Sequence, residues 1–109
     1  MTKAQEVFTP NADGIRSFVV PCPAANTAYR LPECSVPDDM PLVIKAYPTN
    51  AGMIFVGESA SAAINPNQSY PLLPNEAVAY RVKNADAIYI SANTAGDSVV
   101  CTVEQSLGY

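Results

Sequence analysis

The segment YPLLPNEAVAYRVKNADAIYISANTAGDSVV, residues 70–100, decides the fold class of this 109-residue chain. Within it and just beyond it, three runs (76–83, 87–92 and 98–104) alternate apolar side chains with small or polar ones. Successive side chains of a strand point to opposite faces, so the alternation predicts strands with one buried face. The side chains expected in the core are Val78, Tyr80, Val82, Ile88, Ile90, Ala92, Val99, Cys101 and Val103. The linkers NAD and NTAGD have hairpin length and predict three consecutive antiparallel strands.

A corner of sequence Pro-Leu-Leu-Pro, residues 71–74, precedes these runs. Its prolines fix φ on either side of the two leucines and hold them in place without a ladder hydrogen bond. We expect Glu76 to accept a hydrogen bond from nearby backbone at this corner. The Ala-rich stretch at 57–68 contains Pro66 and predicts a loop with at most one helical turn.

The first half of the chain shows shorter strand signals. Residues 15–21, 41–48 and 53–57 are rich in β-branched and aromatic side chains, and proline bounds the first two. The turn-forming TNAG at 49–52 predicts that the last two pair as a hairpin. The proline-rich segment 21–41 predicts a long loop with an edge strand at AYRL, residues 28–31.

These patterns predict an all-β fold, specifically an antiparallel β-sandwich of jelly-roll type. A chain of this length fits a single domain, which we place at residues 15–109. Residues 1–14 show no core pattern apart from Val7 and Phe8, and we interpret them as an extended N-terminal arm.

Charge and hydropathy exclude several classes of function. The formal net charge is −4 and the six basic residues are scattered, which argues against a nucleic-acid partner. No apolar run approaches the roughly 20 residues of a membrane helix, so no membrane partner is expected. The first residues lack the apolar core of a signal peptide, so we expect synthesis in the cytoplasm without export. Charged residues make up 15%, which suggests a partly apolar surface that partners cover.

Catalytic chemistry is sparse. The chain has no histidine, so Ser-His-Asp and Cys-His catalysis cannot be built within it. GESAS at 57–61 lacks the closing glycine of a nucleophile elbow, and Asp38 and Asp39 would point apart in an extended segment. NADG at 11–14 matches the start of a calcium loop, but apolar residues interrupt the later ligand positions, so a turn is favoured. We expect no enzyme activity, no cofactor and no metal site.

The three cysteines are Cys22, Cys34 and Cys101. They are odd in number and show no CxxC spacing. In a reducing compartment this pattern is typical of small buried apolar residues, rather than of a disulfide framework or a zinc site.

The order of elements from residue 53 to 104 resembles a known group. A strand ends in Val-Gly, a polar loop follows, and PLLPNE leads into an alternating strand, IYI and GDSVV. This order resembles the small β-domain accessory proteins of tailed-phage virions, especially capsid decoration or cement proteins and head-fibre modules. The resemblance implies a non-enzymatic structural protein on the outside of the capsid, bound to the major capsid protein and assembled as a homotrimer.

Four residues are candidates for protein contacts. Outward-facing Tyr89 and terminal Tyr109 suit an interface, because tyrosine combines a large apolar ring with a polar hydroxyl. Val7 and Phe8 would serve the same purpose in the arm. An alternative function stays open, namely a glycan- or receptor-binding module of a phage fibre or tail, favoured by exposed tyrosines and Asn/Asp-rich loops.

Overall fold

A computed structural model of the chain describes residues 14–105. The strands are β1 (Gly14–Pro21), β2 (Tyr29–Arg30), β3 (Leu42–Ala46), β4 (Ile54–Gly57), β5 (Tyr70–Leu72), β6 (Ala77–Tyr80), β7 (Tyr89–Ala92) and β8 (Ser98–Gln105). Two short helical segments complete the fold: α2 (Ala60–Ala63) and the 3-10 turn η1 (Ala85–Ala87). No helix within residues 14–105 has the length and apolar character needed to span a membrane.

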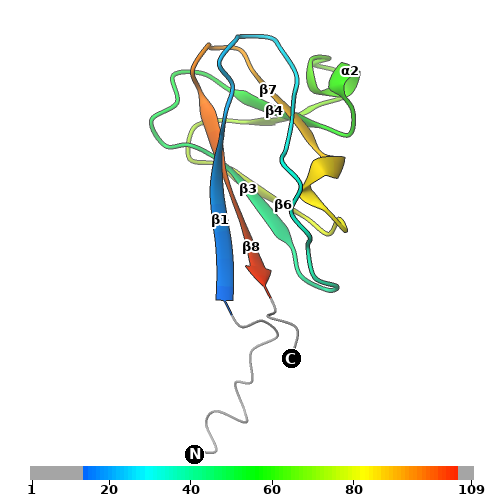
Figure 1. The fold of residues 1–109 in the computed structure, drawn as a ribbon. Coiled ribbons are helices and arrows are strands. Elements are labelled where there is room, and N and C mark those ends of the chain that lie inside the picture. The colour runs from blue at the N-terminus through cyan, green and yellow to red at the C-terminus, as the bar shows by residue number, and fades with distance from the viewer. Residues whose placement is uncertain (1–13, 106–109) are drawn as a thin grey trace, which may run out of the picture.

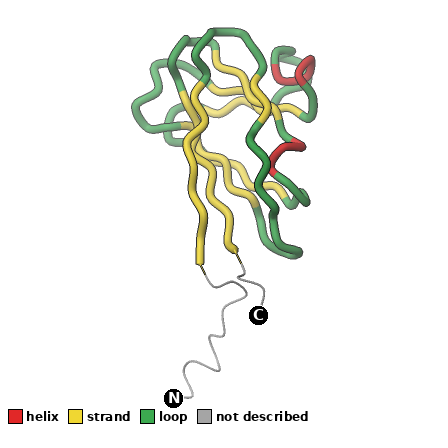
Figure 2. Tube along the Cα trace, viewed as in Figure 1, coloured by secondary structure: helices red, strands yellow, loops and turns green. Residues whose placement is uncertain are grey.

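The strands form two four-stranded antiparallel sheets that face each other (Figures 1 and 2). Sheet A has the order β1-β8-β3-β6, and sheet B has the order β2-β7-β4-β5. The predicted all-β sandwich is therefore confirmed. Among the described strands, every connection except β4 to β5 passes from one sheet to the other. The expected jelly-roll arrangement stays an interpretation of this strand order.

The predicted hairpin between residues 41–48 and 53–57 is wrong, because β3 belongs to sheet A and β4 to sheet B. The Asn50 side chain donates to the Ser98 carbonyl (2.8 Å) and accepts from the Ser98 amide (2.9 Å). The Asp97 carboxylate accepts from the Ala51 and Gly52 amides at 3.0 and 2.8 Å. These bonds hold the turn against the start of β8, so the chain leaves sheet A instead of folding back on β3.

The three alternating runs form strands, but they are not adjacent to one another as predicted. β6 is an edge strand of sheet A, β7 lies in sheet B, and β8 lies between β1 and β3. The pairing of β1 with β8 extends from Gly14 opposite Gln105 to Pro21 opposite Ser98, and the two strands run side by side in Figure 1. Because β1 and β3 occupy both sides of β8, β6 cannot pair with β8 and pairs with β3 instead.

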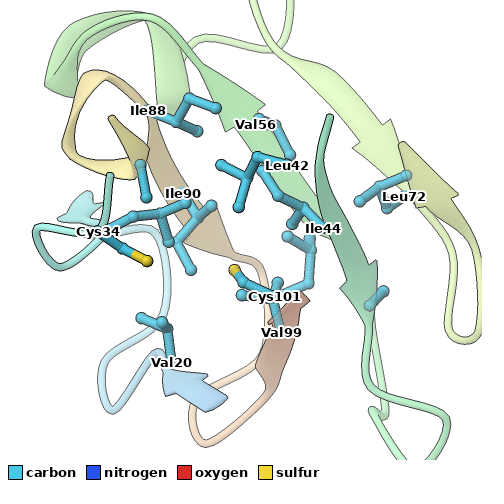
Figure 3. Close-up of a cluster of buried hydrophobic side chains, with 14 of the residues drawn as sticks. Val20, Cys34, Leu42, Ile44, Val56, Leu72, Ile88, Ile90, Val99 and Cys101 are labelled. Atoms are coloured by element: carbon cyan, nitrogen blue, oxygen red, sulfur yellow. The ribbon is translucent and has the colours of Figure 1, made fainter. Parts of the chain in front are cut away.

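The predicted inward faces are confirmed. The core members of β7 and β8, together with Ile88, are buried, and Figure 3 shows Ile88, Ile90, Val99 and Cys101 among them. Val78, Tyr80 and Val82 are half-buried against the core. Cys22, Cys34 and Cys101 are buried, as expected of small apolar residues. Ser91 lies on the outward side of β7 and is nevertheless buried, because its hydroxyl donates to the Ala63 carbonyl of α2 at 2.7 Å.

The Pro-Leu-Leu-Pro corner holds one leucine inside and one outside. Leu72 is buried while Leu73 is exposed, and Glu76 Oε1 accepts from the Leu73 amide at 2.8 Å, as predicted. Asn75 has a left-handed φ of 74° and donates its amide to the Ala46 carbonyl. The corner therefore connects β5 of sheet B to β6 of sheet A while remaining tied to the end of β3.

Two smaller predictions are also confirmed. The Ala-rich stretch forms the single turn α2, in which the Ser59 hydroxyl accepts from the Ala62 amide as an N-cap. β2 is an edge strand of sheet B within the expected segment 28–31. Residues 1–13, which carry most of the expected arm, lie outside the described residues, and Gly14 is the first residue of β1.

Candidate functional site

The outward side of sheet A carries mostly apolar and small side chains. Alternation along the four strands defines this set, which we call the outer face of sheet A: Ile15, Ser17, Val19, Val43, Lys45, Ala77, Ala79, Val100, Thr102 and Glu104. Lys45 and Glu104 are its charged members. An antiparallel sheet that faces only water usually presents polar residues on that side. This face is typical of a surface that contacts another molecule.

The apolar character is strongest along β1. Ile15 and Val19 are 72% and 54% exposed. Val19 lies opposite Val100, and the Ser17 hydroxyl donates to Thr102 Oγ1 at 3.0 Å across the same strand pair. Because the two hydroxyls bond to each other, burying them against a partner would break fewer hydrogen bonds to water and would cost less free energy.

β1 is also an edge strand. It pairs along its eight residues with β8, and within the described part of the chain no strand lies on its other side. Natural proteins usually protect such an edge with charges, prolines or a bulge, because its free backbone groups can pair with another chain. Here Arg16 is the charged residue of the strand, and its guanidinium lies over the Phe18 ring, 5.9 Å from the centroid.

A cavity of about 480 Å³ opens between the sheets on the side where β5 and β6 are the edge strands. Val56, Val82 and Ile88 form its apolar wall, and Tyr70 and Tyr80 flank it. Burial raises the pKa of Tyr80, and the nearby Tyr70 adds to the effect. The two phenol groups therefore lie close enough to influence each other although their strands belong to different sheets.

The sequence-predicted contact residues do not come together on the outer face of sheet A. Tyr89 is half-buried on the outward side of sheet B, where the Arg30 guanidinium lies 5.7 Å from its ring centroid. Arg30 Nε also donates to the Asp86 carbonyl at 2.7 Å, which holds the guanidinium over the ring. Val7, Phe8 and Tyr109 lie outside the described residues.

Sequence reasoning missed the apolar outer face, although a signal for it was present. Val19, Val43 and Val100 occupy outward positions of alternating strands, where polar residues are the rule. The pair Tyr70 and Tyr80 had no such signal, because only the tertiary fold brings β5 and β6 to the same open side.

The described residues offer little for catalysis or metal binding. No group of three or more His, Cys, Asp or Glu side chains within residues 14–105 is arranged to hold a metal ion. Burial raises the pKa of Cys22 to about 11, with a smaller contribution from Asp97, and raises that of Cys101 to about 12. Both thiols are therefore protonated at neutral pH and are poor nucleophiles.

Comparisons with known proteins give one structural likeness. No protein-family model matches the chain, and no curated protein matches it. The chain is similar to a solved structure described under "Bacillus endospore appendages form a novel family of disulfide-linked pili". The identity is 13% over 84% of this chain and 88% of that chain, with a TM-score of 0.41. The assignment of the sandwich rests on the strand pairing within this chain.

Proposed function

We propose that this protein is a non-enzymatic structural protein of a phage virion, which binds the outside of the capsid and stabilises the shell. The observation that carries the proposal is the outer face of sheet A, where Ile15 and Val19 are exposed, Val43 and Val100 are half-buried, and only two of the ten side chains are charged. The resemblance of residues 53–104 to decoration and cement proteins supplies the partner, the major capsid protein.

The energetics of a repeated shell favour such a surface. A face of valine, isoleucine and alanine gains free energy mainly by removing apolar area from water, about 25 cal/mol per Å². One contact of this kind is weak, but a homotrimer that binds several capsid subunits at once gains affinity through effective concentration. In this proposal the two charged members, Lys45 on β3 and Glu104 on β8, set the orientation of the contact rather than its strength.

Two measurements test the proposal: the mass of the protein in solution and its cosedimentation with capsid shells that lack it. We expect a trimer, and we expect binding that Val19→Lys weakens at least about tenfold, because a lysine would be buried in an apolar contact. Ile64→Lys is the matched control, since Ile64 is 52% exposed and follows α2, away from sheet A.

Equal binding by wild type and Val19→Lys would rule out the outer face of sheet A as the contact. Failure of the wild type to bind any shell would rule out the capsid role itself, and a monomeric mass would contradict the trimer.

A further inference from the structure

The cavity between β5 and β6 is not used by the proposed capsid contact. Its volume of about 480 Å³ falls within the range of roughly 300–1,000 Å³ that small-molecule sites occupy. It is open to solvent on the side where β5 and β6 are the edge strands, so a ligand can enter without displacing the core. The outer face of sheet A points away from it, which makes the two surfaces independent of each other.

The two tyrosines face this space because of the strand alternation. Tyr70 lies two residues before the buried Leu72 on β5, so both side chains project toward sheet A. Tyr80 lies two residues after the inward Val78 on β6 and projects toward sheet B. Tyr70 is 54% exposed and Tyr80 is half-buried, which leaves ring surface accessible to a ligand.

Polar groups line the rim of the cavity and are free to bind. The side chains of Glu58, Asn67 and Gln68 are exposed and make no hydrogen bond within residues 14–105, although the backbone amide of Asn67 donates to Asn65 Oδ1 at 2.9 Å.

The charges restrict the ligand class. No lysine or arginine lines the cavity, and Glu58 is its charged residue, so an anionic ligand would meet repulsion without compensation. An added peptide strand is also disfavoured, because Pro71 in the middle of β5 has no amide hydrogen to donate to a new neighbour. Among neutral ligands, the lining fits a compact molecule with hydroxyl groups on one side and an apolar face on the other.

We propose that this cavity binds one neutral sugar residue. The amide and carboxylate side chains of the rim offer both donors and acceptors to ring hydroxyls, and the tyrosine rings offer flat apolar surface to the C–H face of the sugar. The apolar wall formed by Val56, Val82 and Ile88 accommodates a methyl group, so an N-acetylated hexose fits better than a plain hexose. The inference does not rest on the capsid role, and it gives the glycan-binding alternative a defined place.

Titration of ¹⁵N-labelled protein with D-glucose, D-galactose, N-acetyl-D-glucosamine and anionic N-acetylneuraminic acid tests the proposal. We expect saturable shifts of the Glu58, Gln68 and Tyr80 amide signals with the neutral sugars, with the tightest binding by N-acetyl-D-glucosamine. Tyr70→Ala should weaken that binding about tenfold, which corresponds to about 1.4 kcal/mol. Tyr47→Ala is the matched control, because Tyr47 is 39% exposed and lies outside the cavity.

A second variant separates loss of binding from loss of fold. Ala87→Trp places a bulky ring in the cavity from an exposed position of η1 and should abolish the shifts while the rest of the spectrum stays dispersed. The proposal is overturned if no neutral sugar gives saturable shifts, if Ala87→Trp binds as the wild type does, or if N-acetylneuraminic acid binds more tightly than the neutral sugars.

Discussion

At the scale of single residues, Asp97 connects three segments that are distant in sequence. Its carboxylate accepts from the Ala51 and Gly52 amides, and its backbone carbonyl accepts from the Cys22 amide at 2.8 Å. The residue is only 6% exposed, so its two oxygens depend on these amides in place of water. The side chain of Asp97 thus holds the β3–β4 turn against the start of β8, and its backbone carbonyl holds the residue that follows β1.

Asp97→Asn should lower the free energy of unfolding by about 2 kcal/mol, because one amide loses its charged acceptor and faces an NH₂ group instead. Urea denaturation measures the change, with Asp38→Asn as the control, since Asp38 is exposed and lies in another loop. If Asp97→Asn were as stable as Asp38→Asn, the hydrogen bonds of the Asp97 carboxylate would contribute nothing measurable to the free energy of unfolding.

At the scale of elements, the corner between β5 and β6 depends on one backbone conformation. Asn75 has a φ of 74°, a region that costs most L-residues about 1–2 kcal/mol and that asparagine and glycine adopt more readily. Asn75→Ala should therefore lower the free energy of unfolding by about 1 kcal/mol, whereas Asn75→Gly should change it by less than about half of that. Chemical denaturation of both variants checks this, and equal losses would contradict the conformational explanation.

The strands and their buried faces were predictable from the sequence, but the strands with which they pair were not. Period-two alternation identifies a strand and its buried face, which is why Ile90, Val99 and Cys101 were placed correctly. Alternation does not identify the partner of a strand. The turn at 49–52 has hairpin composition, but its polar groups bond to Asp97 and Ser98, so long-range contacts decided the pairing.

Of the two candidate surfaces, the outer face of sheet A could be predicted from the sequence and the cavity could not. The outer face of sheet A follows from apolar residues at outward positions, once the register aligns Val19 with Val100 and Val43 with Thr102. The cavity could not be predicted, because Tyr70 and Tyr80 meet only after the corner carries the chain from one sheet to the other. Tyr89 was predicted as a contact residue because it is an outward-facing tyrosine, but the Arg30 guanidinium lies over its ring.

At the scale of the whole molecule, the core contains two fully buried thiols whose ionisation opposes folding. In the unfolded chain Cys22 and Cys101 ionise near the usual pKa of 9.0, whereas in the folded protein they stay protonated until about 11 and about 12. Above pH 9 the unfolded state therefore binds fewer protons than the folded state. Stability present below pH 9 is lost as the pH rises toward 11 and 12.

We expect the free energy of unfolding to fall above pH 9 with a slope of up to about 1.4 kcal/mol per pH unit for each thiol. Urea denaturation from roughly pH 8 to about pH 11 measures this slope, because that range spans the usual thiol pKa of 9.0 and the raised pKa of Cys22. Cys101→Ala should be less stable at pH 8 but should show a shallower slope. An unchanged slope in that variant would show that Cys101 does not contribute.

The central position of β8 in sheet A has a consequence for biosynthesis. β1 and β3 both pair with β8, which follows every other described strand in the chain. A nascent chain leaving the ribosome therefore carries β1, with Ile15 and Val19, without its partner until β8 emerges. Pairing over so long a sequence separation is slow, and unpaired strands aggregate meanwhile. The order of synthesis therefore makes the pairing of β8 with β1 and β3 the last strand pairing of the described fold to become possible.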